Sequence, residues 1–336
     1  MENNTLIIAE IGQAHDGSLG VAHSYIDAVA ETGADAVKFQ LHIAKEESTS
    51  SEQFRANFSF QDKSRYEYWE RMEFSFDQWL ELRNHAKERD LLFIVSPFSE
   101  KAVDIIEEID SDYIKIGSGE VFSPSLIKRA MKTNIPIIAS TGMSSFTEIN
   151  ELENTLAKGG KENYSLLHCT SEYPVQPDNI GFNVLLQMKK QFECPIGFSD
   201  HSGNIASSIA AMVLGAEIIE VHVTFSKDIF GPDVSSSLTL SELNTLVQSK
   251  KFLEKSLNSQ IDKSVLASSL KDMRYIFQKK VITKRNLVQG DILKDEDLVF
   301  LKAKGGIPEA DLDIILGREL KTDLKKGTIL EMKHFK

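Results

Sequence analysis

The stretch PIGFSDHSGNIASSIAAMVLGAEIIEVHVT, residues 195–224, carries the pattern that decides the fold. Its two ends are short apolar runs, which are typical of buried strands. The middle has the spacing of an amphipathic helix. A strand, a helix and a second strand in direct succession predict a βαβ unit in which the two strands are parallel.

The same alternation of short and long patterns fills the chain before this stretch. Helical patterns such as VAHSYIDAVAETG (21–33, ended by Gly33) and FDQWLELRNHAKERD (76–90) separate further apolar runs. These runs are LIIAEIG (6–12), AVKFQ (36–40), LLFIVSPF (91–98), YIKIGSG (113–119), IPIIAST (135–141) and YSLLHCT (164–170). With the two strands of the 195–224 stretch, these runs make eight predicted strands. Eight strand–helix units within about 260 residues predict a closed (β/α)₈ TIM barrel. A doubly wound open sheet is the alternative.

Composition predicts three parts: a catalytic barrel over 1–258, a polar linker over 259–280 and a small β module over 281–336. The module has short strands and frequent glycines. A module of this size can form only a small hydrophobic core on its own. A charged and aromatic segment, 46–73, follows the second strand and is too long for a simple connection. We expect a lid or binding loop there, with a purely structural helical insertion as the alternative.

Overall composition excludes several classes of function. The net charge of −12 over 336 residues disfavours nucleic acid and anionic membranes as partners. No apolar run approaches the roughly 18 to 20 residues that span a bilayer, and the N-terminus lacks a signal-peptide pattern. Cys169 and Cys194 are expected to be buried thiols of a cytoplasmic protein. The chain lacks a complete dinucleotide fingerprint, a P-loop and a GxSxG nucleophile elbow.

Charged residues occupy the side of several strands that should face the barrel interior. Lys38 and Gln40 alternate with Val37 and Phe39 in the second run. The same side of other strands carries Glu10, Lys115, Glu220 and His222. A single such residue could be a satisfied polar group of the core. Several together predict a partly wet cavity for an anionic ligand and a metal, because isolated buried charges cost several kcal/mol.

Hydroxyl groups follow the apolar part of four strands, at Ser96, Ser118, Ser140 and Ser199. Active sites of (β/α)₈ barrels lie at the C-terminal ends of the strands. Serines and backbone N–H groups there, together with the inward lysines, predict a phosphate cradle. Each serine alone could equally cap the following helix.

Two histidines, His201 and His222, lie at the ends of the seventh and eighth predicted strands. Two imidazoles with oxygen ligands from water or substrate suit a divalent metal, with Mn²⁺ expected and Mg²⁺ or Co²⁺ as alternatives. Glu220 could orient His222 or pair with a barrel lysine. His168 is expected to be structural.

Nearly the whole chain resembles the sialic acid synthases. The motifs that carry the resemblance are IAEIGQAHDGS, GADAVKFQ, VSPFS, YIKIGSGE, IIASTGM, LLHCTSEYP, IGFSDHSGN, IIEVHVTF and GPDVSSSL, followed by a module similar to type III antifreeze proteins. The resemblance implies condensation of phosphoenolpyruvate with an N-acyl hexosamine and water to a nine-carbon nonulosonic acid. Our hypothesis for the release of phosphate is C–O cleavage. The resemblance also implies a homodimer in which the C-terminal module of one subunit closes the active site of the other.

The resemblance assigns a role to each matching residue. It implies metal binding by His201 and His222, and it places Gln40, Tyr173 and Asp233 at the sugar. The residues implied to bind phosphoenolpyruvate are Lys38, Ser96, Lys115, Ser118, Ser140 and Ser199. Asp16 stands where the family has a glutamate, and either Asp16 or Asp233 is the candidate for proton transfer.

One departure from the family concerns the acceptor. Ala303 and Lys304 stand where family members often have an arginine that reaches the acyl group of the sugar. N-acetylmannosamine and a diacetamido-trideoxyhexose are therefore both candidate acceptors. The rival interpretations are a metal-dependent synthase or aldolase acting on a sugar 6-phosphate, a non-catalytic sugar- or ice-binding protein, and an inactive relative.

Overall fold

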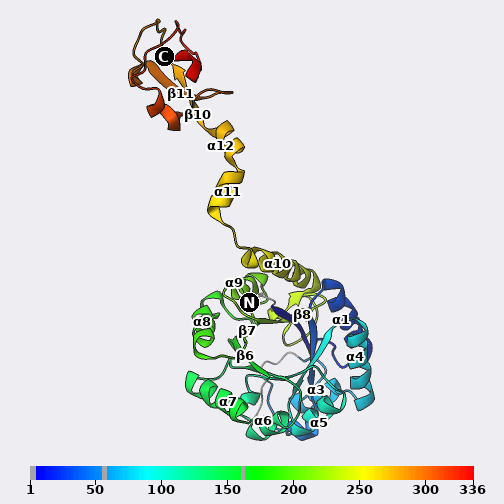
Figure 1. The fold of residues 1–336 in the computed structure, drawn as a ribbon. Coiled ribbons are helices and arrows are strands. Elements are labelled where there is room, and N and C mark those ends of the chain that lie inside the picture. Colours follow the sequence, from blue (N-terminus) through cyan, green and yellow to red (C-terminus); the bar gives the residue numbers. More distant parts are fainter. Residues whose placement is uncertain (1–4, 55–58, 160–162) are drawn as a thin grey trace. The chain divides into compact units, whose positions relative to one another are not determined.

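The N-terminal part of the chain is a closed parallel barrel. The structure is a computed structural model that describes residues 5–54, 59–159 and 163–336. The barrel strands are β1 (Leu6–Gly12), β2 (Ala36–Leu41), β3 (Leu92–Pro97), β4 (Tyr113–Ile116), β5 (Ile137–Ser140), β6 (Tyr164–Cys169), β7 (Ile196–Asp200) and β8 (Ile218–Thr224). Each strand pairs with the next, and β8 pairs with β1 in parallel, with Leu6 opposite Ile218. These pairings close the ring of strands that is drawn in Figure 1. The predicted TIM barrel is confirmed, and the open sheet is wrong.

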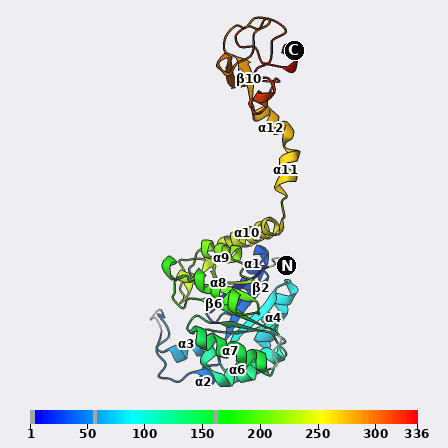
Figure 2. The same ribbon diagram turned by 60° about the vertical axis from the view of Figure 1, so that its left-hand side comes forward.

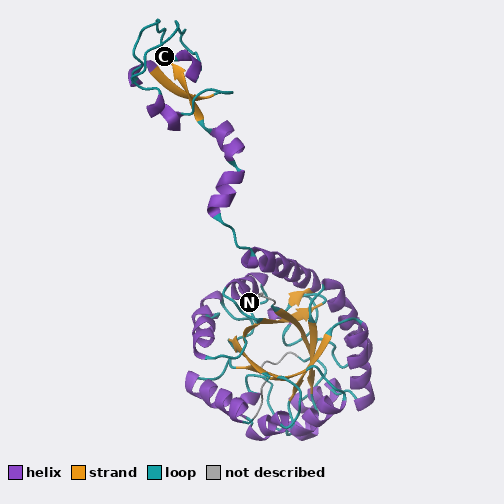
Figure 3. Cartoon of the chain, in the orientation of Figure 1, coloured by secondary structure: helices purple, strands orange, loops and turns teal. Residues whose placement is uncertain are grey.

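Helices form a ring outside the strands (Figure 3). They are α1 (Leu19–Thr32), α4 (Phe76–Glu88), α5 (Glu100–Glu108), α6 (Pro124–Met131), α7 (Phe146–Lys158), α8 (Phe182–Gln191), α9 (Ile205–Val213) and α10 (Leu240–Asn258). Helix α1 ends at Gly33 as predicted, because a left-handed backbone (φ 75°) lets the Gly33 N–H reach the Ala30 carbonyl.

The segment after β2 contains two short helices. They are α2 (Ala44–Glu47) and α3 (Arg65–Met72), and they precede α4 (Figure 2). Tyr68, Trp69 and Met72 of α3 are buried in a small apolar cluster together with Ala44 of α2. The predicted lid at 46–73 includes residues 55–58, which lie outside the described part of the chain.

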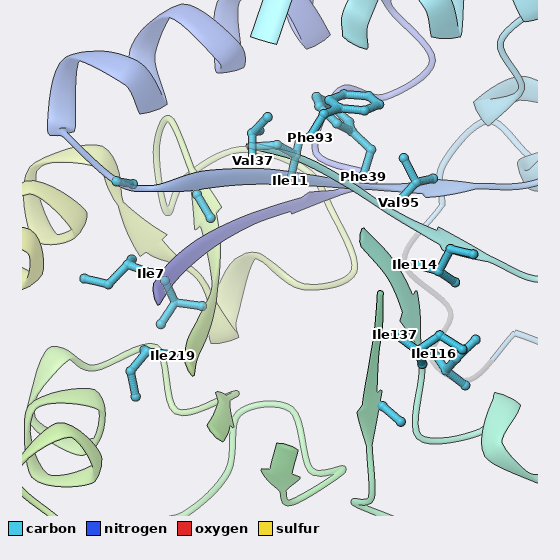
Figure 4. Close-up of a cluster of buried hydrophobic side chains, with 14 of the residues drawn as sticks. Ile7, Ile11, Val37, Phe39, Phe93, Val95, Ile114, Ile116, Ile137 and Ile219 are labelled. Carbon is cyan, nitrogen blue, oxygen red and sulfur yellow. The ribbon is translucent and has the colours of Figure 1, made fainter. Parts of the chain in front are cut away.

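The outward side of the strands packs against the helices and forms the main core (Figure 4). Ile7, Val37, Phe39, Phe93 and Ile219 belong to this layer. A separate apolar cluster fills the N-terminal end of the barrel interior, and its buried members are Ile8, Ala36, Ile94, Ile138, Leu167 and Ile218. The interior is therefore closed at that end by hydrocarbon, as in other barrels of this class.

The chain divides into two compact units, residues 1–258 and 259–336. In the second unit, β10 (Lys279–Thr283) pairs antiparallel with β11 (Leu298–Lys302) over its own apolar cluster, which includes Val281, Leu320 and Phe335. The stretch expected to be a polar linker contains two short helices, α11 (Lys263–Ser269) and α12 (Lys271–Phe277). The Asp262 side chain caps the first of them.

Two expectations from composition can be compared with the structure. Within the described ranges, no helix has both the length and the apolar character needed to cross a membrane. Cys169 is buried as predicted, but Cys194 is only half-buried, because it follows α8 and precedes β7 rather than lying within a strand.

Candidate active site

The polar site begins in the layer of inward-facing side chains next to the apolar cluster that fills the N-terminal end of the barrel. Side chains two residues apart on a strand face the same way, so the layer after Ile8 and Ala36 contains Glu10 and Lys38. The corresponding residues of the other strands include Ser96, Ser140, Cys169 and Glu220. The strand pattern thus changes from apolar to polar at the same height around the barrel, toward the C-terminal ends of the strands.

A cavity of about 880 Å³ opens above this layer. Eleven of the twelve site residues expected from the sequence and the resemblance line it. They are Lys38, Gln40, Ser96, Lys115, Ser118, Ser140, Tyr173, Ser199, His201, His222 and Asp233. Its size is within the range of cavities that bind small substrates.

Four buried charges form one cluster at the base of the cavity. Lys38 Nζ lies 3.0 Å from Glu10 Oε2 and 3.5 Å from Glu220 Oε1. Lys115 Nζ lies 3.2 Å from the same Glu220 oxygen. Of the two roles expected for Glu220, the structure shows the ion pair with barrel lysines. Two positive and two negative side chains balance, which makes their burial affordable.

The two lysines differ in their electrostatic surroundings. Burial alone would lower the pKa of Lys38, but Glu10 and Glu220 outweigh it and raise the pKa. Burial lowers the pKa of Lys115, and Glu220 offsets this only in part. The pKa of Glu220 is held below its usual range, because Lys115 and Lys38 outweigh its burial. Lys38 is therefore firmly cationic, and Lys115 is the lysine that loses its proton more readily.

Serine hydroxyls accompany the lysines. Lys38 Nζ donates to Ser96 Oγ (3.2 Å), and Lys115 Nζ donates to Ser140 Oγ (2.7 Å). Ser118 Oγ accepts from the Gly142 N–H at 3.1 Å. Ammonium groups and hydroxyls converge here, and these are donors that bind a phosphate or carboxylate group.

The two histidines lie side by side above the lysines, with ring centroids 5.6 Å apart. His201 Nδ1 is 2.9 Å from the Thr170 carbonyl, to which it must donate, so Nε2 keeps its lone pair. Burial, followed by the neighbouring His222, lowers the pKa of His201 to about 4. Tyr173 stacks on the His201 ring at 4.2 Å. His201 is thus a neutral, oriented imidazole at neutral pH.

This geometry fits a two-histidine metal site. A metal-binding histidine commonly donates its second N–H to a carbonyl, as His201 does. Glu220 Oε2 is buried without a hydrogen-bond partner among the described residues, which leaves an acceptor for a ligand hydroxyl or water. Within the same described part of the chain, no set of three or more His, Cys, Asp or Glu side chains surrounds one point.

Asp16 is the one expected site residue that does not line the cavity. It lies in the turn after β1 with a left-handed backbone (φ 49°), and its carboxylate is 2.6 Å from Arg71 Nη1 of α3. His168, expected to be structural, is buried and contacts the Ile180 carbonyl through Nε2 at 2.8 Å.

Several cavity residues were not predicted individually from the sequence. They are Gln13, His42, Trp69, Phe98 and Glu120. Burial, followed by Glu47, raises the pKa of Glu120. His42 could have been found, because it lies two residues beyond Gln40 and shares its inward side. The others follow strands or belong to the segment between β2 and α4 that contains α2 and α3, which we call the insertion. Strand alternation does not predict which way side chains point in these places.

A barrel with a lysine–serine cradle and two imidazoles at its strand ends defines an enzyme site for a small anionic ligand. The chain belongs to the NeuB family: residues 25–262 match that family, and residues 280–336 match the SAF domain. The resemblance to sialic acid synthases is thereby confirmed.

Relatives of known name agree over nearly the full chain. N,N'-diacetyllegionaminic acid synthase of Campylobacter jejuni is 33% identical over 97% of this chain and 98% of its own. Human N-acetylneuraminate-9-phosphate synthase is 33% identical over 97% of this chain and 91% of its own. A crystal structure of N-acetylneuraminic acid synthetase from Leptospira borgpetersenii, in complex with citrate, is 29% identical, covers 81% of this chain and 93% of its own, and has a TM-score of 0.71.

Proposed function

We propose that the protein is a nonulosonic acid synthase. It condenses phosphoenolpyruvate with an N-acyl hexosamine and water, and it releases a nonulosonic acid and phosphate. The observation that carries this proposal is the cavity in which Lys38 and Lys115, with their serine partners, lie below His201 and His222. The names of the relatives support the product class.

The residues of this chain would bind and orient both substrates. Lys38, Lys115 and the serines hold the phosphate and carboxylate of phosphoenolpyruvate, and its C3 forms a bond to the aldehyde carbon of the open-chain sugar. Water adds to C2, and the bond between C2 and the phosphate oxygen breaks to release phosphate. Asp233 lines the cavity and is the better placed of the two candidates for proton transfer. Holding both reactants together supplies several kcal/mol of barrier reduction.

His201 and His222 would hold a divalent metal ion, Mn²⁺ in the first place and Mg²⁺ or Co²⁺ as alternatives, whose contribution is to polarise the acceptor aldehyde. Tyr173 and the Thr170 carbonyl fix the His201 ring for this purpose. Metal dependence is tested by removing metal with a chelator and restoring each ion separately.

The charges around the cavity favour an acceptor without a phosphate group. Apart from the four buried charges and the histidines, six carboxylates and two basic groups line it among the described residues. The carboxylates are Glu46, Glu47, Glu52, Glu100, Glu120 and Asp233, and the basic groups are Arg65 and Lys101. Arg65 is already paired with Glu52 at 3.2 Å. A phosphate dianion would meet net repulsion there, whereas N-acetylmannosamine or a diacetamido-trideoxyhexose would not.

The test is sugar-dependent release of phosphate from phosphoenolpyruvate with Mn²⁺ and a panel of acceptors, together with product mass. The panel contains N-acetylmannosamine, its 6-phosphate and diacetamido-trideoxyhexoses, because Ala303 and Lys304 leave the acyl group undetermined. Release with an unphosphorylated sugar is expected. Preference for the 6-phosphate would favour the rival synthase, and no release from folded, metal-loaded protein would favour the aldolase or inactive relative.

The resemblance also supports a domain-swapped homodimer. Light scattering is expected to give twice the mass of the chain. Two inactive variants, one altered in the barrel and one in the 281–336 module, should regain part of the activity when mixed, because a swapped dimer pairs an intact barrel with an intact module. A monomer, or no recovery after exchange of subunits, would contradict this arrangement.

A further inference from the structure

His42, which directly follows β2, is held between two aromatic rings beside the cavity. Its imidazole stacks on Trp69 at 3.8 Å, with an angle of 12° between the rings, and on Phe98 at 4.2 Å and 16°. The side chain is only 1% exposed. Trp69 belongs to α3 of the insertion, and Phe98 follows β3. The ring therefore has one plane, which is set jointly by the barrel and the insertion.

The two nitrogens of His42 have partners of opposite character. Nδ1 is 2.6 Å from Glu47 Oε1 of α2, and Nε2 is 2.7 Å from the amide nitrogen of Gln13. A carboxylate can only accept, so Nδ1 must carry the proton. An amide nitrogen can only donate, so Nε2 accepts from Gln13. The other polar neighbour of Nε2, Gln40 Oε1, lies at 3.5 Å, which is too far to compete with the 2.7 Å contact. Both ends require the same tautomer, a neutral imidazole protonated at Nδ1.

This polarity continues into the candidate substrate site. The amide nitrogen of Gln13 also donates to Gln40 Oε1. Gln40 Nε2 in turn donates to Glu10 Oε1 at 2.6 Å, and Glu10 is the partner of Lys38. The amide oxygen of Gln40 thus accepts from Gln13, and among the described residues only Glu10 accepts from the amide nitrogen of Gln40, so its second N–H can donate to a ligand in the cavity.

We propose that His42 is a positioning residue that, through Gln13, orients Gln40 so that it presents an N–H donor to the bound substrates. The orientation depends on the insertion, because Glu47 of α2 selects the tautomer and Trp69 of α3 sets the ring plane. This inference rests on the proposed function for its kinetic consequence, but the hydrogen-bond polarity is independent of it.

The test uses the full-length protein and three substitutions. His42→Phe keeps a ring between Trp69 and Phe98 but removes both hydrogen bonds. Glu47→Gln keeps the shape and removes the requirement for a proton on Nδ1, because an amide can donate as well as accept. Glu70→Gln makes the same chemical change on the exposed side of α3, outside the cavity, and is the control.

Two measurements are made on each variant. The nitrogen shifts of ¹⁵N-histidine-labelled protein, assigned by the signal that His42→Phe removes, are expected to show Nδ1 protonated in the wild type and in Glu70→Gln, and Nε2 protonation appearing in Glu47→Gln. Acceptor kcat/KM is expected to fall about 10- to 100-fold in His42→Phe and Glu47→Gln. It should stay unchanged in Glu70→Gln.

A wild-type His42 protonated at Nε2 would overturn the proposal, as would folded His42→Phe and Glu47→Gln variants with wild-type kcat/KM. If wild-type protein releases no phosphate with any acceptor, the proposed function fails. The tautomer measurement then still decides whether the hydrogen-bond chain is as described.

Discussion

Asp16 and Arg71 form an ion pair at the edge of the barrel, with Nη1 2.6 Å from the carboxylate and 3.0 Å from the Asp16 carbonyl. Arg71 also donates to Asp62 through Nη2 at 2.8 Å. The Asp16 carboxylate is therefore engaged by a guanidinium group of the insertion, whereas Asp233 lines the cavity. The two candidates for proton transfer are not equivalent.

We expect Asp233→Asn to lower kcat about 100-fold or more, as loss of a general acid–base group does. Asp16→Asn should lower kcat much less and should chiefly raise KM, because it weakens the contact that holds α3. Steady-state kinetics with the best acceptor separates the two effects. A larger fall in kcat for Asp16→Asn would return the proton-transfer role to Asp16.

Because the charges of the buried cluster balance, we expect a second substitution to restore stability lost by the first, but not to restore ligand binding. Lys115→Met should destabilise the barrel by about 3 to 5 kcal/mol, because it removes the nearer of the two ammonium groups that pair with the buried Glu220. Adding Glu220→Gln should restore part of the stability, while phosphoenolpyruvate binding stays lost. Thermal unfolding and calorimetric titration measure the two quantities.

Lys158→Met, on the exposed side of α7, serves as the control for this pair and should change neither quantity. A double variant less stable than Lys115→Met would show that the four charges do not compensate one another as the distances indicate.

Gly142 has no room for a side chain next to the phosphate cradle. A Cβ there would lie 2.5 Å from Cys169 Sγ, 2.6 Å from Ser171 Oγ and 3.0 Å from Ser118 Oγ. Gly142→Ala should displace Ser118 and weaken phosphoenolpyruvate binding by a factor of about 10, roughly the loss of one hydrogen bond. Titration calorimetry of the folded variant checks this value.

Gly20→Ala is the matched control, because a Cβ at Gly20 meets nothing within 4 Å. It lies in α1 and should stabilise the helix slightly, by about 0.5 to 1 kcal/mol. Equal affinity for phosphoenolpyruvate in Gly142→Ala and wild type would mean that Ser118 does not contribute to binding.

His15 predicts a dependence of stability on pH. Burial, followed by the neighbouring His42 and Arg71, lowers the pKa of His15 to about 3. The unfolded chain binds a proton near pH 6.5 and the folded chain does not, so the contribution is complete above pH 6.5. It is lost as pH falls, by up to about 1.4 kcal/mol per pH unit, until about pH 3.

The pH effect of His15 is isolated by comparison with His15→Asn, whose amide oxygen can still accept the Gly17 N–H that His15 Nδ1 accepts at 3.1 Å. The free energy of unfolding of the barrel, from urea titrations at several pH values, should fall more steeply with acidity in the wild type. Parallel curves would show that His15 is protonated in the folded protein.

Strand alternation in the sequence was sufficient to predict most of the barrel strands and the residues that face its interior. Lys38 and Gln40 face inward because Val37 and Phe39 face the helices, and this relation is local. The position of Asp16 is not local. Left-handed residues at Gly12 (φ 54°) and Asp16 (φ 49°) turn the chain away from the strand pattern, and the partner of Asp16, Arg71, belongs to an insertion far along the sequence.

The hydrogen-bond chain through His42 was beyond sequence reasoning for a similar reason. Its direction depends on Glu47, Gln13 and Gln40, which come from three segments whose mutual distances only the folded chain defines. Cys194 was predicted to be buried because it lies beside an apolar run, but it is only half-buried. A residue next to a buried strand is not necessarily buried itself.

The charge cluster at the base of the cavity also affects how the site can bind an anion. Lys38 and Lys115 are already neutralised by Glu10 and Glu220, so an arriving anion enters a cluster that has no net positive charge. Each lysine that turns to the substrate leaves a buried carboxylate that must acquire a proton or a cation. Occupation of this site by an anion is therefore coupled to the uptake of positive charge.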